Sequence, residues 1–209
     1  MKYTNGKPIF IVYEGLDGVG KTTCAKQTAN LLGARYLTTP SDLLRKYRDE
    51  IISSYASCQE AAQLFYLSTV FAAANEAKSN LQAGQSVVLD RYLLSTQVYA
   101  KFRGSLLETN NAVENLLLAA DLTVYLEAPL PVRRRRLEAR GFSSADNETA
   151  TEVADTILRH GYERWRTHPV AGKWLHFDSS MSSPEEISKA VISSIRTQEE
   201  ALACSSVSR

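Results

Sequence analysis

The segment from position 15 to position 22 combines residue types that can hold a chain of phosphates. It reads Gly15-Leu16-Asp17-Gly18-Val19-Gly20-Lys21-Thr22. This spacing fits the pattern G-x-x-x-x-G-K-[ST], in which glycines let backbone N–H groups approach a phosphate closely. The lysine can neutralise the β- and γ-phosphates, and the threonine hydroxyl can hold Mg²⁺. We therefore predict that these residues, together with Thr23, bind ATP.

The surroundings of this segment favour a binding loop over a glycine-rich turn with an exposed lysine. The β-branched and aromatic run 8–13 (PIFIVY) precedes it, and a helical pattern begins near Lys21. A helix N-terminus there would add about half a positive charge. The loop alone does not separate switches, motors and kinases. However, the Asn-Lys-x-Asp run that a signalling GTPase needs is missing from the sequence, and a ring ATPase usually has a longer chain.

The second motif is an aspartate followed by an arginine at the end of another apolar run. Residues 86–90 (SVVLD) are typical of a buried strand that ends in Asp90, and Arg91 comes next. Because strand ends gather at the ligand-binding edge of a parallel sheet, both side chains are expected near the phosphates. Asp90 would share Mg²⁺ with Thr22, and Arg91 would face a second phosphate. A local Asp–Arg ion pair without a function is the alternative interpretation.

Alternating strands and helices must position these residues. The expected strands are 8–13, 36–38, 86–90, 122–127 and 174–178, and the expected helices are 21–32, 41–55, 59–81, 110–120, 131–140, 149–166 and 184–196. This order predicts an α/β fold of the P-loop NTPase type, in three layers, with a five-stranded parallel sheet, helices on both faces and a short lid. Residues 141–147 (GFSSADN) are expected to form a mobile loop.

The composition limits the class of protein. The chain has 209 residues, 44% of them apolar, and a net charge of +1. We expect one kinase-sized domain over 1–197, with its lid at about 136–150, and a C-terminal tail at 198–209. The small charge argues against a nucleic-acid partner, and apolar runs stay below the roughly 20 residues that span a bilayer. A soluble, cytoplasmic protein is therefore expected, and widely spaced cysteines argue against disulfides.

The two motifs together resemble those of the thymidylate kinase family. The loop reads EGLDGVGKTT over 14–23, and the run DRYLLSTQVY over 90–99 is similar to the family's D-R-Y-x-x-S-x-x-x-Y. The LFY triplet over 64–66 looks like the family's Phe-bearing helix. The R-x-x-x-R-G spacing over 136–141 looks like the start of its lid. The resemblance covers nearly the whole chain.

The resemblance implies an enzyme that uses ATP and Mg²⁺ to phosphorylate a pyrimidine nucleoside 5′-monophosphate. Phosphoryl transfer needs positioning and positive charge, which agrees with this interpretation. The implied catalytic side chains are Lys21, Arg91, Arg136 and Arg140. The implied acceptor-binding side chains are Asp17 near the sugar, Phe65 stacked on the base, Arg91 on the phosphate, and Arg45, Arg48, Thr69, Ser95 and Tyr99 around them. A homodimer is implied by analogy.

A run of four arginines, 133–136, lies at the start of the expected lid. Four adjacent residues span about one helical turn, so they cannot all face one ligand. Arg136 and Arg140 are four residues apart and share a helix face, which favours these two over Arg134 and Arg135. The latter two are expected on the surface.

The chain departs from the family where the base would be read. Thr69 stands where the family has an Arg, and Ala100 stands where it usually has Gln. Pro40 matches the family's loop after the second strand, but its acid and glycines are replaced, so the phosphate-binding arginine could be Arg45 or Arg48. Some of these departures resemble the mitochondrial-type UMP-CMP kinases. The sequence therefore leaves open an acceptor whose base is a pyrimidine other than thymine.

Two other functions remain open from the sequence alone. A deoxynucleoside kinase, or a kinase of a specialised nucleotide, would share the phosphate loop and the acid–Arg pair at a strand end. A family member that binds nucleotide without catalysis is the other alternative, and the arginine-poor stretch after Gly141 motivates it. The intact loop and the Asp90-Arg91 pair argue against that alternative.

Overall fold

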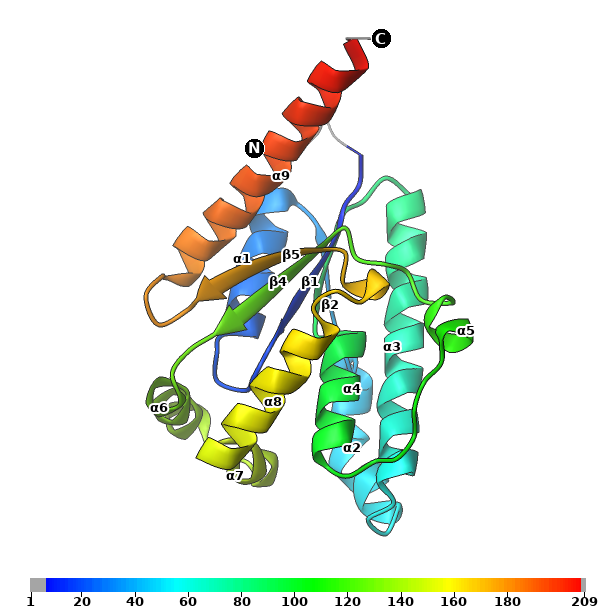
Figure 1. The fold of residues 1–209 in the computed structure, drawn as a ribbon, viewed down its shortest axis with the longest axis vertical. Helices are drawn as coiled ribbons and strands as arrows, with labels where there is room; N and C mark the ends of the chain where they lie inside the picture. The colour runs from blue at the N-terminus through cyan, green and yellow to red at the C-terminus, as the bar shows by residue number, and fades with distance from the viewer. Residues whose placement is uncertain (1–6, 208–209) are drawn as a thin grey trace.

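A parallel sheet runs through the centre of the computed structural model, which describes residues 7–207 (Figure 1). The strands are β1 (Phe10–Gly15), β2 (Arg35–Thr38), β3 (Val87–Asp90), β4 (Leu122–Glu127) and β5 (Lys173–Asp178). Their order is β2-β3-β1-β4-β5, and every neighbouring pair is parallel. All residues of β1 and β3 are buried, as expected for strands covered on both faces. The predicted five-stranded parallel sheet is confirmed.

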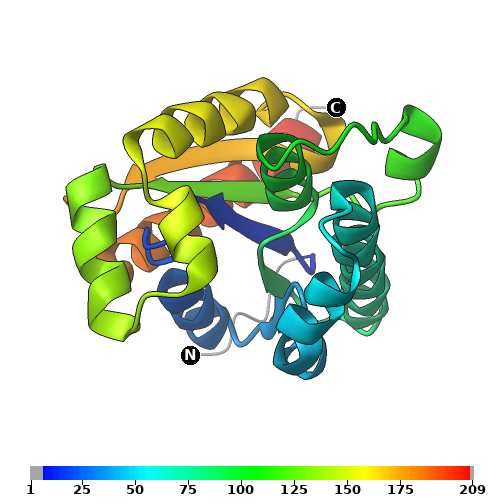
Figure 2. The ribbon, with the colours of Figure 1, turned by 90° about the horizontal axis from the view of Figure 1, so that it is seen from below.

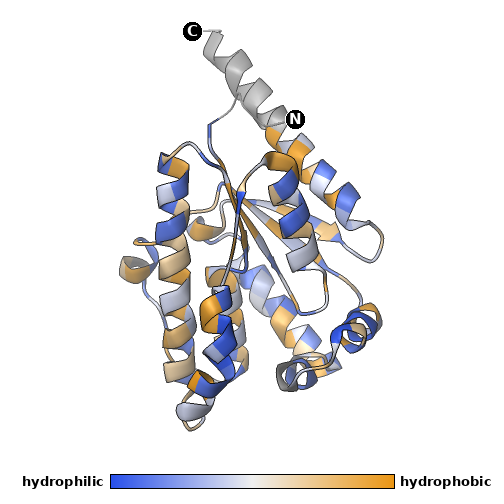
Figure 3. Ribbon diagram, turned by 180° about the vertical axis from the view of Figure 1, so that it is seen from behind, coloured by the Kyte–Doolittle hydropathy of each residue, from blue (hydrophilic) through white to orange (hydrophobic). Residues whose placement is uncertain are grey.

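Helices cover both faces of this sheet. They are α1 (Lys21–Leu32), α2 (Asp42–Ser54), α3 (Gln59–Gln82), α4 (Leu93–Phe102), α5 (Asn111–Glu114), α6 (Leu130–Arg140), α7 (Ser144–Thr149), α8 (Glu152–Trp165) and α9 (Pro184–Val207), with a 3₁₀ turn at Pro169–Ala171. Helices α1 and α9 pack together on one face, and α4 and α8 pack together on the other (Figure 2). Most helices carry both hydrophobic and hydrophilic residues (Figure 3), as helices between a sheet and solvent do.

The central strands bring the two sequence motifs to the same edge of the sheet. Strands β1 and β3 are neighbours, with Tyr13 opposite Asp90, so the loop after β1 lies beside the residues that follow β3. Helices α6 and α7 lie beyond the carboxyl ends of β1 and β4 (Figure 1). The phosphate loop, the Asp90-Arg91 pair and the arginines of α6 therefore meet at one place.

Two expected segments differ from the structure. The helix expected over 110–120 is limited to α5, because the amides of Leu116 and Leu117 bond to carbonyls three residues back and the chain then leaves the helical path. The mobile loop expected over 141–147 contains the start of α7. Ser143 caps this helix by accepting from the Asp146 amide, while its own amide donates to the Asp146 carboxylate at 2.9 Å.

The C-terminal helix also extends further than expected. Helix α9 was predicted to end at 196, but it continues to Val207, into the segment predicted as a tail. Among residues 7–207, every helix is too short or too polar to cross a bilayer.

Candidate active site

The loop between β1 and α1 is shaped by glycines that neighbouring elements leave no room to replace. Gly15 has a φ of +134°, and a Cβ there would lie 2.2 Å from the Leu126 carbonyl oxygen of β4. Gly18 has a φ of +82°, and its Cβ would lie 2.8 Å from the Arg133 carbonyl oxygen of α6. Both values of φ belong to glycine, and both close approaches require it. The loop is therefore held between β4 and α6.

Lys21 begins α1 inside the cavity formed by this loop. Its Nζ donates to the Leu16 carbonyl at 2.6 Å, and the side chain is buried. Burial and the nearby positive charge of Arg91 lower the pKa of Lys21 to about 7, against the opposing charges of Asp17, Asp90 and Glu14. The ammonium thus lacks enough negative charge around it, which a bound phosphate would supply.

Two oxygen ligands of the kind that Mg²⁺ prefers lie next to Lys21. Thr22 Oγ1 donates to Asp90 Oδ2 at 2.6 Å, and the Tyr36 hydroxyl donates to the same oxygen at 3.4 Å. Asp90 Oδ1 is buried without a hydrogen-bond partner among the described residues. A buried carboxylate oxygen without a donor fits a site completed by a hydrated cation. The residues present therefore fit Mg²⁺.

Arg91 lies between the loop and the rest of the cavity. It has a φ of +69° and pairs with the Asp17 carboxylate, while Nη1 donates to Ser95 Oγ at 3.0 Å. Its guanidinium lies 5.2 Å from the ring centre of Tyr99, whose hydroxyl donates to Asp17 Oδ2 at 2.8 Å. Burial by itself would raise the pKa of Asp17, but the positive charges of Arg91 and Lys21 hold this pKa below the ordinary range. The structure thus brings Asp17, Arg91, Ser95 and Tyr99 together.

Glu14 is a site residue to which the sequence analysis assigned no role. It is fully buried at the end of β1, and its carboxylate accepts from the amides of Tyr92 at 2.9 Å and Ser95 at 3.2 Å. Burial raises the pKa of Glu14, although these donors and Arg91 oppose the rise. The carboxylate holds the first turn of α4 and with it the position of Arg91. An acid at the end of a fully apolar run, just before Gly15, was the available signal.

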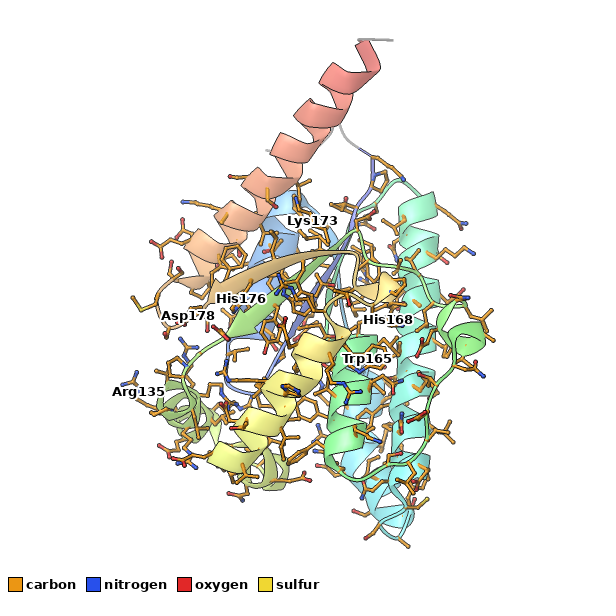
Figure 4. The ribbon with its side chains drawn as sticks, viewed as in Figure 1. Arg135, Trp165, His168, Lys173, His176 and Asp178 are labelled. Carbon is orange, nitrogen blue, oxygen red and sulfur yellow. The ribbon has the colours of Figure 1, made fainter. Side chains whose placement is uncertain are left out.

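The arginines of α6 divide between three environments. Arg133 is fully buried, donates to the Asp17 carbonyl at 3.0 Å, and pairs with Asp155 of α8. Arg136 donates to the Ser179 carbonyl at 2.7 Å and lines the cavity. The exposed Arg134 and Arg135 do not line the cavity, and Arg135 points away from the molecule (Figure 4). Sequence reasoning did not identify Arg133, because its burial depends on the approach of the loop.

Arg140 also lines the cavity, one helical turn beyond Arg136. Its Nη2 donates to Asp146 Oδ1 of α7 at 2.8 Å. The two lid arginines therefore share a face, and each is bonded to a neighbouring segment of the chain.

The cavity continues from the phosphate loop to α2 and α3. Its volume of about 1340 Å³ exceeds the roughly 300–1,000 Å³ of a pocket for one small ligand. Arg45 and Arg48, which are predicted to bind the acceptor, line it from α2. The exposed fraction of both guanidiniums leaves them accessible to a ligand. A cavity of this volume has room for two nucleotides.

Helix α3 presents a different face to this cavity from the one that the resemblance implies. Gln63 and Tyr66 line the cavity, whereas Phe65 and Thr69 do not. Thr69 is buried, and its hydroxyl donates to the Tyr66 carbonyl at 2.7 Å. Residues 59, 63 and 66 share one helix face, so a neighbouring position such as 65 points elsewhere. The structure therefore does not bring Phe65 and Thr69 to the site.

A phosphate loop after the central strand of a parallel sheet is the arrangement of P-loop nucleotide-binding proteins. The cavity extends beyond the loop to α2 and α3, and its volume leaves room for an acceptor, which indicates a small-molecule kinase within that class. The family model "Thymidylate kinase" matches residues 13–188. The chain belongs to the thymidylate kinase family.

Several proteins with similar sequences are named as probable thymidylate kinases. The probable thymidylate kinase of Caldivirga maquilingensis is 30% identical over 174 residues, which cover 78% of this chain and 84% of the relative. That of Pyrococcus abyssi is 34% identical over 151 residues, or 63% and 71% of the two chains. That of Methanococcus maripaludis strain C7 is 32% identical over 132 residues, and this chain spans 66% of its length.

Solved structures confirm the fold. A thymidylate kinase from Candida albicans superposes with a TM-score of 0.68 at 17% identity, over 92% of this chain and 93% of the other. A deoxyadenosine kinase from M. mycoides superposes with a TM-score of 0.65 at 17% identity, over 90% and 100%. The predicted fold class and the predicted family are both confirmed.

Proposed function

We propose that the protein transfers the γ-phosphoryl group of ATP to the 5′-phosphate of a pyrimidine nucleoside monophosphate, with dTMP as the leading acceptor. The position of Arg91 carries this proposal, because its guanidinium is bonded to Asp17 of the loop and lines the same cavity as Lys21. A monophosphate acceptor brings negative charge that the guanidinium can bind. A nucleoside would present a neutral 5′-hydroxyl there. The family and its relatives' names support dTMP.

The donor half of the reaction uses charge that the loop holds in place. Lys21 would bind the β- and γ-phosphate oxygens, and Thr22 and Asp90 would hold Mg²⁺. When bound, the ion neutralises charge on the phosphates. Arg136 and Arg140 line the cavity from α6, from where their guanidiniums would reach the transferring group.

The acceptor half uses Arg91 together with Arg45 and Arg48 of α2. All three guanidiniums line the cavity, and they would hold the monophosphate in line with the γ-phosphate of ATP. Asp17 would then approach the sugar, and Tyr99 would limit the space beside it. These roles extend the expectations from the sequence.

A coupled ADP-release assay with Mg·ATP tests the proposal directly. The acceptors are dTMP, dUMP, UMP, CMP and dCMP, together with thymidine and deoxycytidine. We expect turnover on pyrimidine monophosphates and none on the nucleosides. Turnover on nucleosides alone would identify a nucleoside kinase, and ATP binding without any turnover would identify a non-catalytic member.

Protonation of Lys21 predicts a pH-dependent step in ATP binding. With its pKa at about 7 in the free protein, Lys21 is mostly neutral at pH 8, and bound phosphate favours the charged form. Mg·ATP binding should therefore take up close to one proton per site at pH 8 and little at pH 6, and its affinity should fall by up to about tenfold per pH unit above 7. Calorimetry in buffers of different ionisation enthalpy measures this uptake. Uptake that persists in Lys21→Met would assign the proton to another group.

Binding of the acceptor's base should depend on Tyr66 more than on Phe65. Stacking of an aromatic side chain on a base contributes about 1–3 kcal/mol, so Tyr66→Leu should raise the KM for dTMP by about tenfold or more. Phe65 does not line the cavity, and Phe65→Leu is the matched control, with an expected change under about threefold. A larger effect of Phe65→Leu would support the assignment that the resemblance implies.

We also propose a cytoplasmic location, because the substrates are ATP and free nucleotides. The cavity favours small nucleotides over a nucleic acid as partners. The homodimer stays a prediction. Helix α3 is a candidate for its interface, because Leu64 on that helix is 54% exposed. Light scattering of the purified protein measures this directly.

A further inference from the structure

One buried amide in the α3 wall of the cavity is oriented by residues outside the cavity. Gln63 lines the cavity, and only 2% of its surface is exposed. Its Nε2 donates to Gln97 Oε1 at 2.8 Å, and its Oε1 accepts from Ser105 Oγ at 2.6 Å. Because the two ends of a glutamine amide have nearly the same shape, the direction of these bonds must follow from their further partners.

The hydrogen-bond chain through Gln63 ends at a backbone amide on each side, and the side that contains a carboxylate sets its direction. On one side, Ser105 Oγ accepts from the Leu107 N–H at 3.3 Å and donates to Gln63 Oε1; because a hydroxyl can accept a second bond, this side follows the orientation of Gln63 and does not set it. On the other side, the Val170 N–H donates to His168 Nδ1 at 3.2 Å. A backbone N–H only donates, so the ring hydrogen of His168 lies on Nε2. His168 lies in the turn after α8 (Figure 4).

Glu114 and Thr109 pass this direction on to Gln97. His168 Nε2 donates to Glu114 Oε2 at 2.9 Å, and Thr109 Oγ1 donates to Glu114 Oε1 at 2.5 Å. A carboxylate only accepts, so the single hydrogen of Thr109 is used there. Thr109 must then accept from Gln97 Nε2, at 3.1 Å, which leaves Gln97 Oε1 for Gln63. The Glu114 end of the chain therefore imposes this orientation on Gln63, and Ser105 agrees with it by donating to Gln63 Oε1.

Gln63, which lines the cavity, consequently keeps one N–H group for a further partner. Its Oε1 and one Nε2 hydrogen are bonded to Ser105 and Gln97, and neither of these two residues lines the cavity. Within the described part of the chain, the second Nε2 hydrogen has no acceptor. Thr69, where the resemblance leads to an expected base-reading residue, is already bonded to a backbone carbonyl. A ligand with a carbonyl oxygen at this wall would accept the free N–H.

We propose that Gln63 selects an acceptor base with a carbonyl at position 4, as in thymine and uracil, over cytosine with its 4-amino group. This inference rests on the proposed function and specifies its substrate. A cytosine amino group would place a donor against a donor in a site where turning the amide would break bonds to Ser105 and Gln97. Gln63 would then reject cytosine in the way that a fixed buried polar group rejects a mismatched partner.

The nucleotides dUMP and dCMP test this choice, because their bases differ in the group at position 4. Calorimetry should show that the wild-type protein binds dUMP about tenfold or more tightly than dCMP. Gln63→Glu replaces the donor with an acceptor of the same shape and should reduce the ratio to about one or invert it. Gln82→Glu is the matched control, because it makes the same change at an exposed position of the same helix and should leave the ratio unchanged.

A second variant tests the orientation while keeping Gln63 itself. Ser105→Ala combined with Thr109→Val removes the hydroxyl that directs the chain and the hydroxyl that holds Gln63 Oε1, and neither residue lines the cavity. The amide can then turn to suit either base, so the preference for dUMP should fall to within about threefold. A merely structural loss would weaken the binding of both nucleotides and leave their ratio intact, which separates the two explanations.

Binding and phosphoryl transfer are measured separately on the same preparations. A ratio that stays within twofold of wild type in folded Gln63→Glu, or equal wild-type binding of dUMP and dCMP, would overturn the role of Gln63. The predicted binding preference without any transfer would support Gln63 and contradict the proposed function. Phosphoryl transfer together with a dUMP-to-dCMP ratio that the variants leave unchanged would support the proposed function and contradict the role of Gln63. Failure to bind either nucleotide would overturn both.

Discussion

Replacing Lys21 with alanine should lower kcat by about 10³-fold or more, with the fold retained. Lys21 carries the charge at the base of the loop, and charge placed at the transferring phosphates is the main contribution to phosphoryl transfer. Burial lowers the pKa of this lysine, so its charge is destabilising in the free protein. In the variant, the Leu16 carbonyl loses its hydrogen-bond donor, which costs about 1–3 kcal/mol of folding free energy. Removal of the buried ammonium offsets part of this cost.

The coupled assay measures kcat, and circular dichroism during heating checks the fold. Lys26→Ala is the matched control, because Lys26 lies on the exposed side of the same helix. Its kcat should change by less than about twofold. If Lys21→Ala retained activity within tenfold of wild type, the phosphate loop would not be the donor site.

Replacing Arg133 with methionine should reduce the free energy of unfolding by about 3 kcal/mol and weaken ATP binding. Breaking a buried ion pair costs about 3–5 kcal/mol. Asp155 is only partly exposed, but it keeps a second partner in Arg159 at 2.8 Å, so the lower end of that range applies. The Asp17 carbonyl would lose its donor as well. On that side the loop would keep the close approach of Gly18 to α6 and the hydrogen bond from Arg136 Nη1 to the Gly18 carbonyl at 3.3 Å.

Urea unfolding and calorimetric titration with Mg·ATP measure the two effects. Arg135→Met makes the same change two positions along α6, at an exposed residue. Its free energy of unfolding should stay within about 0.5 kcal/mol of the wild-type value. Arg133→Lys should recover only part of the loss, since an ammonium lacks the fork that bonds Asp17 and Asp155 at once. A cost below about 1 kcal/mol for Arg133→Met would show that α6 does not support the loop.

Much of the candidate site could be predicted from local sequence. The phosphate loop and the Asp90-Arg91 pair are each contiguous, and their chemistry depends on residue type and on the strand that precedes them. Strand positions followed from short apolar runs, because a strand covered on both faces needs continuous apolar residues. The lid arginines followed from helical spacing, although Arg133 did not.

The acceptor side shows where this reasoning reaches its limit. The LFY triplet identified α3, but the rotation of that helix decides whether Phe65 or Tyr66 meets the cavity, and the sequence pattern contains both. Likewise, Glu114 was expected inside a longer helix, whereas its carboxylate turns inward to Thr109 and His168. Such rotations depend on contacts between segments far apart in the chain.

The sequence by itself determined the fold class, the phosphate loop and the residue types at the strand ends, because these depend on periodicity and on neighbours along the chain. Only the tertiary structure decided that Glu14 holds the first turn of α4, that Arg133 supports the loop, and that the Gln63 amide is bonded to Gln97 in the wall of the cavity. Each of these roles requires burial beside partners at least 34 positions away. Burial of a polar group is favourable only when its partners are in place, and that depends on the packed molecule.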